Sequence, residues 1–565
     1  MAVIDWILQT LRSYPELAIF LTLGLGYWVG AIRFGSFSLG SVTGVLLAGI
    51  LVGQIDVEIS SQVKSVFFVM FLFAVGYGVG PQFVRGIATD GLPQAIFAVV
   101  ISVLCLASAY IAIVVQSYDV GLGAGLYAGA TTISASIGLA TDAINGLGKP
   151  AAEAQALLNK IPVAYAITYL WGTIGTGLIL ARLGPKLLGI DLTAECARYE
   201  KEMSGGLPAG SGVSAWRQVE LRAFELSKES QVVGKTVESA EAFAAGGARM
   251  FVEGIRRKDE LLEVEPETIL QAGDVIAVSA PRDVIVELES RAKEVEDQSL
   301  LDIPVEKVDV VVTRKEHANR TIMELAGEKF ARGVFLKKIT RGATSVDIPI
   351  LPKTTVNRGD ILTVMGSRKH TDAVVEALGY ADRPTDATDM VWVGIAIVLG
   401  GLVGAVVIPA GNVPITLSTS GGALIAGIVL GWLRGVHPTF GRVPSGALWM
   451  MNSVGLNVFI AIVGISSGPT FIAGVKEAGF GLLFWGVFVT SVPMLLAPLI
   501  GKYVFRFDPA INLGCCGGAR TSTASVAMVG DVANSNVPML GYTVPYAVSN
   551  TLLTLWGLVI VLMLT

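Results

Sequence analysis

Long apolar segments alternate with short polar ones along most of the chain, and this alternation occurs twice. Ten segments are near the length that crosses a hydrocarbon layer of about 30 Å. They are residues 17–32, 39–54, 63–80, 92–115 and 162–183, followed by 390–408, 415–433, 446–465, 479–504 and 541–564. From about residue 191 to residue 389 the chain is instead charged and strand-like. The pattern predicts a polytopic α-helical membrane protein with a small α/β region inserted between two apolar halves.

The two halves also repeat in sequence. Residues 39–53, LGSVTGVLLAGILVG, match residues 417–431, LSTSGGALIAGIVLG. Residues 76–87, GYGVGPQFVRGI, match residues 464–475, GISSGPTFIAGV. Internal duplication of this kind is typical of secondary transporters, in which the substrate site lies at the junction of the repeats.

A polar stretch lies before the last apolar segment of each half. Residues 128–145 (AGATTISASIGLATDAIN) and 517–534 (GGARTSTASVAMVGDVAN) align at a constant spacing of 389, which pairs Ser136 with Ser525 (525 − 136 = 389). Irregular backbone, which these Gly-rich and hydroxyl-rich residues favour, is tolerated inside a bilayer only where protein or water satisfies its polar groups. We expect each stretch to form a re-entrant hairpin, with one substrate site where the two tips meet.

Positive charge indicates the orientation of the chain. Arg33, Arg85 and the pair Arg182 and Lys186 follow the first, third and fifth segments, whereas the loop 54–62 is acidic. Because Lys and Arg concentrate on the cytoplasmic side, we expect the central region in the cytoplasm and both termini outside. The basic loops of the second half fit the same scheme. Five spans per half then make the two repeats inverted relative to each other.

Composition narrows the functional class. Of the 565 residues 15% are charged, and the formal net charge of −5 comes without a basic stripe, so we expect no nucleic-acid partner. Cys105 and Cys196 lack the spacing of a disulfide or metal site, and the neighbours Cys515 and Cys516 are expected to be packing residues. No metal or cofactor is expected. The first apolar segment is not followed by a small-residue cleavage site, so we interpret it as a retained helix.

The charged insert is itself doubled. Its two halves share an apolar strand that follows a Gly-Asp turn, at Gly273-Asp274 and at Gly359-Asp360. Two small α/β modules are expected. The expected domains are residues 1–190 for the first membrane repeat, 191–215 for a linker with a flexible Gly-rich middle, 216–295 and 303–382 for the two modules, and 389–565 for the second membrane repeat.

The order of these parts resembles a known family. The chain is similar to the aspartate:alanine exchanger family of bacterial transporters. The similarity rests on the duplicated half, with GYGVGPQF at Gly76–Phe83 and GISSGPTF at Gly464–Phe471, and on the modules with a Gly-Asp turn between the two copies. The modules look like the RCK-C or TrkA-C subdomain of potassium-conductance regulators, and a ligand for them is left open. The resemblance implies a homodimeric antiporter, not an enzyme, in the bacterial inner membrane. It would exchange an acidic amino acid such as aspartate, or a related dicarboxylate, for a smaller one such as alanine.

Arg520 is the leading candidate for a substrate contact. A guanidinium offers paired donors to a carboxylate, and a charge at membrane depth normally faces a cavity or a partner. The first repeat carries Thr131 at this position, so a carboxylate clamp here would be asymmetric. The alternative is that Arg520 extends toward lipid headgroups. The other candidates are hydroxyl-bearing neighbours on the two stretches and on the last spans: Thr521, Ser522, Thr523, Ser525, Thr131, Thr132, Ser134, Ser136, Tyr165 and Tyr546.

Two acidic and two amide residues occupy equal positions in the two stretches, namely Asp142 with Asp531 and Asn145 with Asn534. The aspartates could bind a coupling cation, take a proton or hold an amino group, or they could cap a helix. The asparagines are expected in turns.

Tyr165 aligns with Tyr546, and Thr168 with Ser549, at a spacing of 381 on the last span of each half (546 − 165 = 381). Each pair places a phenol and a hydroxyl one helical turn apart. These side chains could face the substrate pathway or hold the hairpins in place, and the sequence leaves both roles open.

One motif suggests an alternative function. Val75–Gly78 reads VGYG, as in a potassium filter, which keeps a regulated cation channel or cation transporter as the alternative. A filter of that kind follows a short pore helix. Here the motif ends an apolar span and its repeat at Val463–Ser466 reads VGIS, so a transporter is favoured.

Overall fold

The chain folds into two compact units. The first comprises Met1–Glu200, Arg341–Ile348 and Pro384–Thr565, and the second comprises Lys201–Thr340 and Pro349–Arg383. The computed structural model describes residues 2–34, 37–38, 40–88, 91–203, 219–242, 250–258, 260–289, 292–341, 346–381, 387–410, 413–437 and 441–565. The Gly-rich part of the expected linker, residues 204–214, lies outside the described residues.

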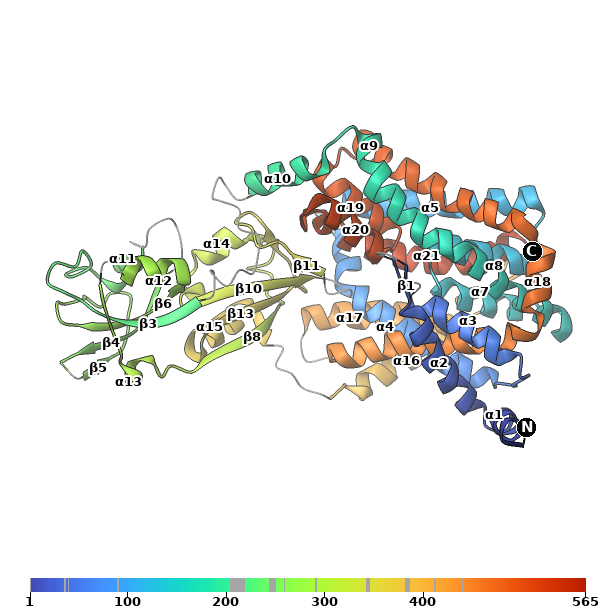
Figure 1. Cartoon of the computed structure of the whole chain (residues 1–565), viewed down its shortest axis with the longest axis horizontal. Helices are drawn as coiled ribbons and strands as arrows, with labels where there is room; N and C mark the ends of the chain where they lie inside the picture. The colour runs from blue at the N-terminus through green and yellow to red at the C-terminus, as the bar shows by residue number, and fades with distance from the viewer. Residues whose placement is uncertain are drawn as a thin grey trace. The chain divides into compact units, whose positions relative to one another are not determined.

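The first unit contains two copies of one order of elements (Figure 1). After helix α1 (Ala2–Ser13), the first copy consists of α2 (Pro15–Gly30), α3 (Ser41–Gly53), α4 (Ser61–Ala88), α5 (Leu92–Gln116), α6 (Val120–Thr131), α7 (Ala135–Gly146) and α8 (Ala151–Leu178). A π-helical turn (Ile179–Leu183), α9 (Gly184–Leu188) and α10 (Leu192–Met203) follow it. The second copy consists of α16 (Met390–Gly404), α17 (Ser418–Val436), α18 (Ser445–Tyr503), α19 (Pro509–Ala519), α20 (Thr523–Ala533), the 3-10 turn η5 (Val537–Gly541) and α21 (Thr543–Met563).

Two irregular features also follow the repeat. A two-stranded ribbon separates the first two helices of each copy: β1 (Arg33–Phe34) with β2 (Phe37–Ser38), and β15 (Ile408–Ala410) with β16 (Val413–Ile415). Helix α18 is two helices joined at Gly479, whose φ of 61° and ψ of −171° interrupt the helical backbone. Its two parts therefore correspond to α4 and α5 of the first copy.

All ten apolar segments predicted from the sequence are helical. Seven helices of the described chain are long and apolar enough to cross a membrane: Ser61–Val84, Leu92–Gln116, Ala151–Leu188, Ser418–Val436, Ser445–Lys476, Gly479–Tyr503 and Thr543–Met563. The other three, α2, α3 and α16, have 16, 13 and 15 residues, fewer than the roughly 20 that a perpendicular span needs. The prediction of a polytopic helical membrane protein built from two repeats is confirmed.

Glycines join the two repeats at two equivalent helix crossings. A Cβ added to Gly53 of α3 would lie 2.2 Å from the carbonyl oxygen of Ile465 in α18, and one added to Gly431 of α17 would lie 2.1 Å from that of Tyr77 in α4. Lipid gives helices little hydrophobic reason to associate, so close backbone packing of this kind stabilises membrane bundles. The motif at residues 39–53 thus packs against the motif at 464–475, and the motif at 417–431 packs against the motif at 76–87.

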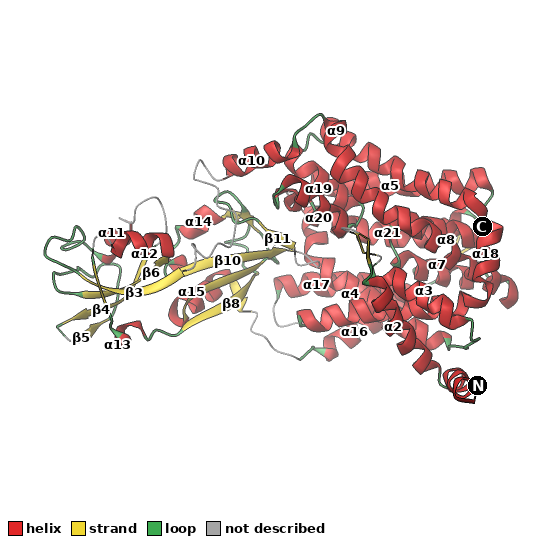
Figure 2. Cartoon of the chain, in the orientation of Figure 1, coloured by secondary structure: helices red, strands yellow, loops and turns green. Residues whose placement is uncertain are grey.

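The chain between α10 and α16 forms two modules with the same strand order, and their strands are yellow in Figure 2. All of these strands but β11 lie wholly or almost wholly in the second unit. The first sheet has the order β5-β4-β6-β3-β7 and the second β11-β10-β13-β8-β14. The strands of the first are β3 (Val219–Glu225), β4 (Phe251–Arg257), β5 (Glu260–Leu262), β6 (Val275–Pro281) and β7 (Lys293–Val295), and those of the second are β8 (Val305–Val312), β10 (Val334–Arg341), β11 (Val346–Ile348), β13 (Ile361–Ser367) and β14 (Gly379–Ala381). A separate ribbon pairs β9 (Arg320–Thr321) with β12 (Thr355–Val356). The accompanying helices are α11 (Val237–Ala242), α12 (Arg282–Glu289), α13 (Gln298–Leu301), α14 (Ile322–Ala326), the 3-10 turn η4 (Lys329–Ala331) and α15 (Arg368–Leu378).

The predicted Gly-Asp turns precede equivalent strands, β6 and β13. The glycine has a φ of 88° in the first module and 83° in the second, which a side chain would strain. The aspartate is 1% exposed in both modules. Asp274 accepts a hydrogen bond from the backbone N–H of Gln271 at 2.7 Å, and Asp360 accepts one from Asn357 at 2.7 Å. The doubled insert is therefore confirmed down to the geometry of its turns.

Charged and aromatic side chains join the two modules. Arg332 of the second module donates to the carboxylate of Glu241 in the first, at 2.7 and 3.1 Å. Glu241 also accepts from the backbone N–H of Val252 at 2.9 Å. The rings of Phe251 and Phe335 meet edge to face with centroids 5.4 Å apart. A change in either module therefore perturbs the other.

Candidate functional site

Two helical hairpins contain the polar stretches predicted from the sequence. The first is α6 with α7 and the second is α19 with α20, and their helices have 11 or 12 residues. At 1.5 Å per residue such helices extend roughly 16–18 Å, too short to cross a bilayer. Each hairpin begins earlier than predicted. Its first arm is as apolar as a span, so only the tip and the second arm stood out in the sequence.

Each hairpin begins at a capping aspartate. Asp119 and Asp508 accept a hydrogen bond from the backbone of the first turn that follows them, at 2.9 Å in both cases. They have the same spacing as the rest of the hairpins (508 − 119 = 389), so a longer alignment would have found them. Lys160 of α8 pairs with Asp119 at 2.8 Å, and Arg198 of α10 pairs with Asp508 at 2.8 Å.

Equivalent threonines reverse the chain at the two tips. Thr132 has a φ of 57° and Thr521 a φ of 56°, a left-handed conformation that is unfavourable for a β-branched residue. Such backbone costs on the order of 1–3 kcal/mol and persists only where the surroundings fix it. Both hairpin tips are therefore tightly determined by the residues around them.

Arg520 follows the last residue of α19, and its side chain is fully buried. Its Nη2 atom donates to the carbonyl oxygen of Ala130, in the last turn of α6, so the two hairpin tips are in contact. Thr490 of α18 donates to the same oxygen at 3.0 Å. The Nε and Nη1 atoms of Arg520 have no hydrogen-bond partner among the described residues. The alternative that Arg520 extends to lipid headgroups is wrong, because none of its side chain is exposed.

A hydroxyl near each tip is hydrogen-bonded to a tyrosine that follows the hairpin. Ser134 and the hydroxyl of Tyr165 are 2.6 Å apart, and Thr523 and the hydroxyl of Tyr542 are 2.7 Å apart. Since Ser134 and Thr523 are equivalent (523 − 134 = 389), Tyr165 corresponds to Tyr542. The predicted pairing of Tyr165 with Tyr546 is wrong.

Glycine contacts support the revised alignment. A Cβ on Gly129 would lie 2.5 Å from the carbonyl oxygen of Tyr165, and one on the equivalent Gly518 would lie 2.4 Å from that of Tyr542. Each of these tyrosines packs against the tyrosine one turn later, at centroid distances of 5.0 and 5.1 Å. The last spans therefore align at 542 − 165 = 377, whereas the hairpins align at 389. The shorter connection in the second copy accounts for the one-turn error.

The other predicted hydroxyls make hydrogen bonds within their own hairpins. Ser522 is the N-cap of α20 and lies 2.6 Å from the hydroxyl of Ser525. Thr131 donates to the carbonyl oxygen of Tyr127 at 2.6 Å, and Ser136 donates to that of Ile133 at 2.7 Å. These side chains shape the tips around Arg520.

The aligned aspartates have different surroundings. Asp142 lies four residues before the end of α7 and Asp531 two residues before the end of α20, so neither caps a helix N-terminus, and that interpretation is wrong. Asp142 accepts a hydrogen bond from Ser418 of α17 at 2.8 Å, whereas Asp531 is exposed. Of the two asparagines, Asn534 forms the predicted turn as the C-cap of α20 with a φ of 48°. Asn145 lies inside α7 and is exposed.

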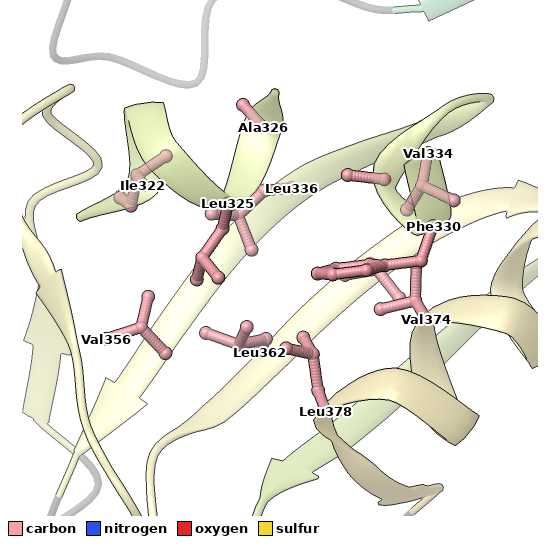
Figure 3. Close-up of a pocket in the computed structure, with 12 residues that line it drawn as sticks. Ile322, Leu325, Ala326, Phe330, Val334, Leu336, Val356, Leu362, Val374 and Leu378 are labelled. Carbon is pink, nitrogen blue, oxygen red and sulfur yellow. The ribbon is translucent and has the colours of Figure 1, made fainter. Parts of the chain in front are cut away.

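An apolar pocket lies in the second module, between α14, η4, α15 and the sheet (Figure 3). Every side chain that lines it is hydrophobic, among them Leu325, Phe330 and Leu362. It offers no charged or hydrogen-bonding side chain to an amino acid. The pocket is therefore unsuited to a charged solute.

The filter-like motif is part of a helix. Val75–Gly78 lies in the interior of α4, so its backbone follows the helix and does not line a pore with a ring of carbonyl oxygens. Gly76 and Gly80 serve instead in packing, because a Cβ on either would lie less than 2.5 Å from backbone atoms of α17.

Broken helices from two repeats that meet around a buried charge define a membrane transporter. Residues 18–184 and 392–562 match the family Asp-Al_Ex, described as a predicted permease membrane region, and residues 221–293 match the TrkA-C domain. The chain belongs to the Asp-Al_Ex family, with a TrkA-C domain between its two membrane halves. The expected family membership is confirmed.

Relatives that match nearly the whole chain are named transporters. An uncharacterized transporter of Shewanella oneidensis is 50% identical over 99% of this chain and 100% of its own length. An uncharacterized transporter of Bradyrhizobium diazoefficiens is 41% identical over 91% of this chain and 100% of its own length. One of Zymomonas mobilis is 31% identical over 99% of this chain and 100% of its own length. These names state no substrate. No solved structure matches the chain.

Proposed function

We propose that the protein is an antiporter that exchanges an acidic amino acid such as aspartate, or a related dicarboxylate, for a smaller amino acid such as alanine. The observation that carries this proposal is the buried guanidinium of Arg520, with Nε and Nη1 unpaired among the described residues. Each unsatisfied buried donor costs about 1–3 kcal/mol, more when charged. A carboxylate at this position would accept from these atoms and remove that cost.

The surroundings of Arg520 favour a bound anion, because the protein neutralises the positive charge of the guanidinium only in part. The carbonyl oxygen of Ala130 lies in the last turn of α6, where the helix dipole contributes roughly half a negative charge. The empty site therefore keeps net positive charge in a low-dielectric region. Movement of the hairpins between outward and inward states is then unfavourable without a bound anion or a replacement solute, which gives obligatory exchange.

The hydroxyls near the tips supply the remaining polarity of the site. Thr131, at the position of Arg520, leaves one side of the junction uncharged, so the solute meets unlike partners at its two ends. Tyr165 and Tyr542 fix the two tips through Ser134 and Thr523. In this proposal the substrate lies between the tips, with its side-chain or α-carboxylate on Arg520.

The orientation and assembly are also proposals. The distribution of Arg and Lys favours cytoplasmic modules and external termini in a bacterial inner membrane. Fusion of a reporter that works only in the periplasm to Thr565 should give activity, and the same fusion within the modules should not. The homodimer suggested by the family resemblance can be tested by measuring the mass of the detergent-solubilised full chain.

Counterflow in proteoliposomes tests the function. Vesicles loaded with unlabelled alanine should take up labelled aspartate, and Arg520→Gln should slow this uptake by about two orders of magnitude, since a buried charged hydrogen-bond partner is typically worth 2–5 kcal/mol. Arg506→Gln is the matched control, because it removes the same charge from an exposed position after α18. Uptake at the wild-type rate in Arg520→Gln would refute the proposal.

The TrkA-C match keeps a regulated cation channel or cation transporter as the second candidate. The helical VGYG segment disfavours the channel. The same vesicles distinguish the two functions: a channel gives a cation current with no internal amino acid, whereas an antiporter gives aspartate uptake only when a counter-solute is present.

A further inference from the structure

Helix α10 connects the membrane unit to the modules. It is a continuous helix from Leu192 to Met203, and the boundary between the two compact units falls within it, between Glu200 and Lys201. At its far end, the carbonyl oxygen of Met203 accepts a hydrogen bond from the backbone N–H of Lys353, in the second module, at 3.1 Å. The helix thus contains residues of both units.

The first part of α10 is attached to both ends of the hairpin that carries Arg520. Arg198 pairs with Asp508, the N-cap of α19, at 2.8 Å. Glu200 accepts a hydrogen bond at 2.6 Å from Ser535, just after the C-cap of α20. Thr193 donates to the carbonyl oxygen of Val532 at 3.2 Å. The entry and the exit of the α19–α20 hairpin are therefore held by a single helix.

The other hairpin is held from within its own repeat. Its capping aspartate, Asp119, pairs with Lys160 of α8, which belongs to the same membrane repeat. At the spacing of the last spans, the position equivalent to Lys160 is Val537 (160 + 377 = 537). Val537 carries no charge, and Asp508 pairs instead with Arg198 of α10.

We propose that α10 transmits the state of the modules to the α19–α20 hairpin, with Arg198 as the positioning residue that couples them. The inference rests on the proposed transport function, because it concerns regulation of the hairpin that carries Arg520. Arg198 acts through Asp508 and touches no substrate. A change that releases or reorients α10 alters the mobility of this hairpin and hence the exchange rate, while the α6–α7 hairpin is unaffected.

Backbone deuterium uptake of the full-length protein in lipid nanodiscs tests the coupling without any substrate. Arg332→Ala perturbs the modules at their mutual contact with Glu241. With Arg198 present, we expect this variant to change uptake in peptides covering residues 509–533 by about threefold or more. In an Arg198→Ala background the change should be much smaller, because only the contacts of Glu200 and Thr193 at the exit of the hairpin remain. Arg198→Lys should restore the response, because lysine can still pair with Asp508.

Three controls make the outcome decisive. Peptides from the modules report whether Arg332→Ala has acted, and peptides covering residues 120–146 should not respond. Lys160→Ala, the matched variant at the other hairpin, should leave the response of residues 509–533 intact. An altered module with no change at residues 509–533, or an equal change with and without Arg198, would overturn the proposal. Failure of aspartate counterflow alone would refute the proposed function and leave this result standing.

Discussion

The close helix crossings predict that replacing one glycine with alanine, which adds a single methyl group, pushes the two repeats apart. In Gly431→Ala the new Cβ would lie 2.1 Å from the carbonyl oxygen of Tyr77, about 1.3 Å closer than the shortest ordinary contact of 3.4 Å. The obstacle is backbone, so α17 and α4 must move apart along their whole crossing. Overpacking of this kind costs about 1–3 kcal/mol, against a helix-propensity gain of at most about 1 kcal/mol for replacing glycine.

A matched control isolates the contact. Gly394→Ala in α16 adds the same methyl group where nothing lies within 4 Å, so it should leave the apparent melting temperature unchanged or raised. Gly53→Ala, at the equivalent crossing, would place its Cβ 2.2 Å from a backbone oxygen and should match Gly431→Ala. The apparent melting temperatures of all three variants can be measured by heating the full chain in detergent and determining by size-exclusion chromatography how much protein stays folded. Equal melting temperatures for Gly431→Ala and Gly394→Ala would refute the backbone-contact argument.

Three further outcomes follow from the structure. Burial, together with the nearby carboxylate of Glu200, raises the pKa of the Cys196 thiol to about 12. Maleimide labelling at about pH 8 should therefore be at least a hundredfold slower than for a free thiol, and its rate should rise as the pH approaches the pKa. Rapid labelling would show that α10 does not pack against the α19–α20 hairpin. Tyr542→Phe removes the hydrogen bond to Thr523 and should slow aspartate counterflow, whereas Tyr546→Phe should act less; the reverse order would restore the alignment taken from sequence. Asp274→Ala leaves its partner Arg257, now paired at 2.8 Å, without a carboxylate and should lower the melting temperature of the modules by several degrees, as seen by circular dichroism; no shift would contradict a structural role for the turn.

Periodicity and repetition were sufficient for the architecture. Long apolar segments form helices because a helix satisfies its own backbone polar groups in lipid. The duplicated motifs at residues 39–53 and 417–431 marked the two copies. The Gly-Asp turns of the modules were equally readable, since each demands a positive φ and a buried carboxylate at a fixed position. These features depend on local sequence alone.

Other features depend on tertiary contacts that one sequence does not reveal. The first arms α6 and α19 resemble ordinary spans in composition, so the hairpins were predicted too short. The tyrosine pairing failed because the connection between hairpin and span differs in length between the copies. Helix α10 lies in a segment predicted as linker, and the significance of Arg198 depends on Asp508, which lies 310 residues later.

The difference between Arg520 and Thr131 has a consequence for the geometry of transport. Pseudo-symmetric repeats can exchange shapes between the two open states, but their side chains cannot exchange identities. If the proposed contact holds, a carboxylate on Arg520 stays against the α19–α20 hairpin throughout the crossing. The solute then keeps one end toward the second repeat whichever side is open. The outward-open and inward-open conformations are then related by a pseudo-two-fold rotation, whereas the proposed carboxylate contact at Arg520 is the same in both.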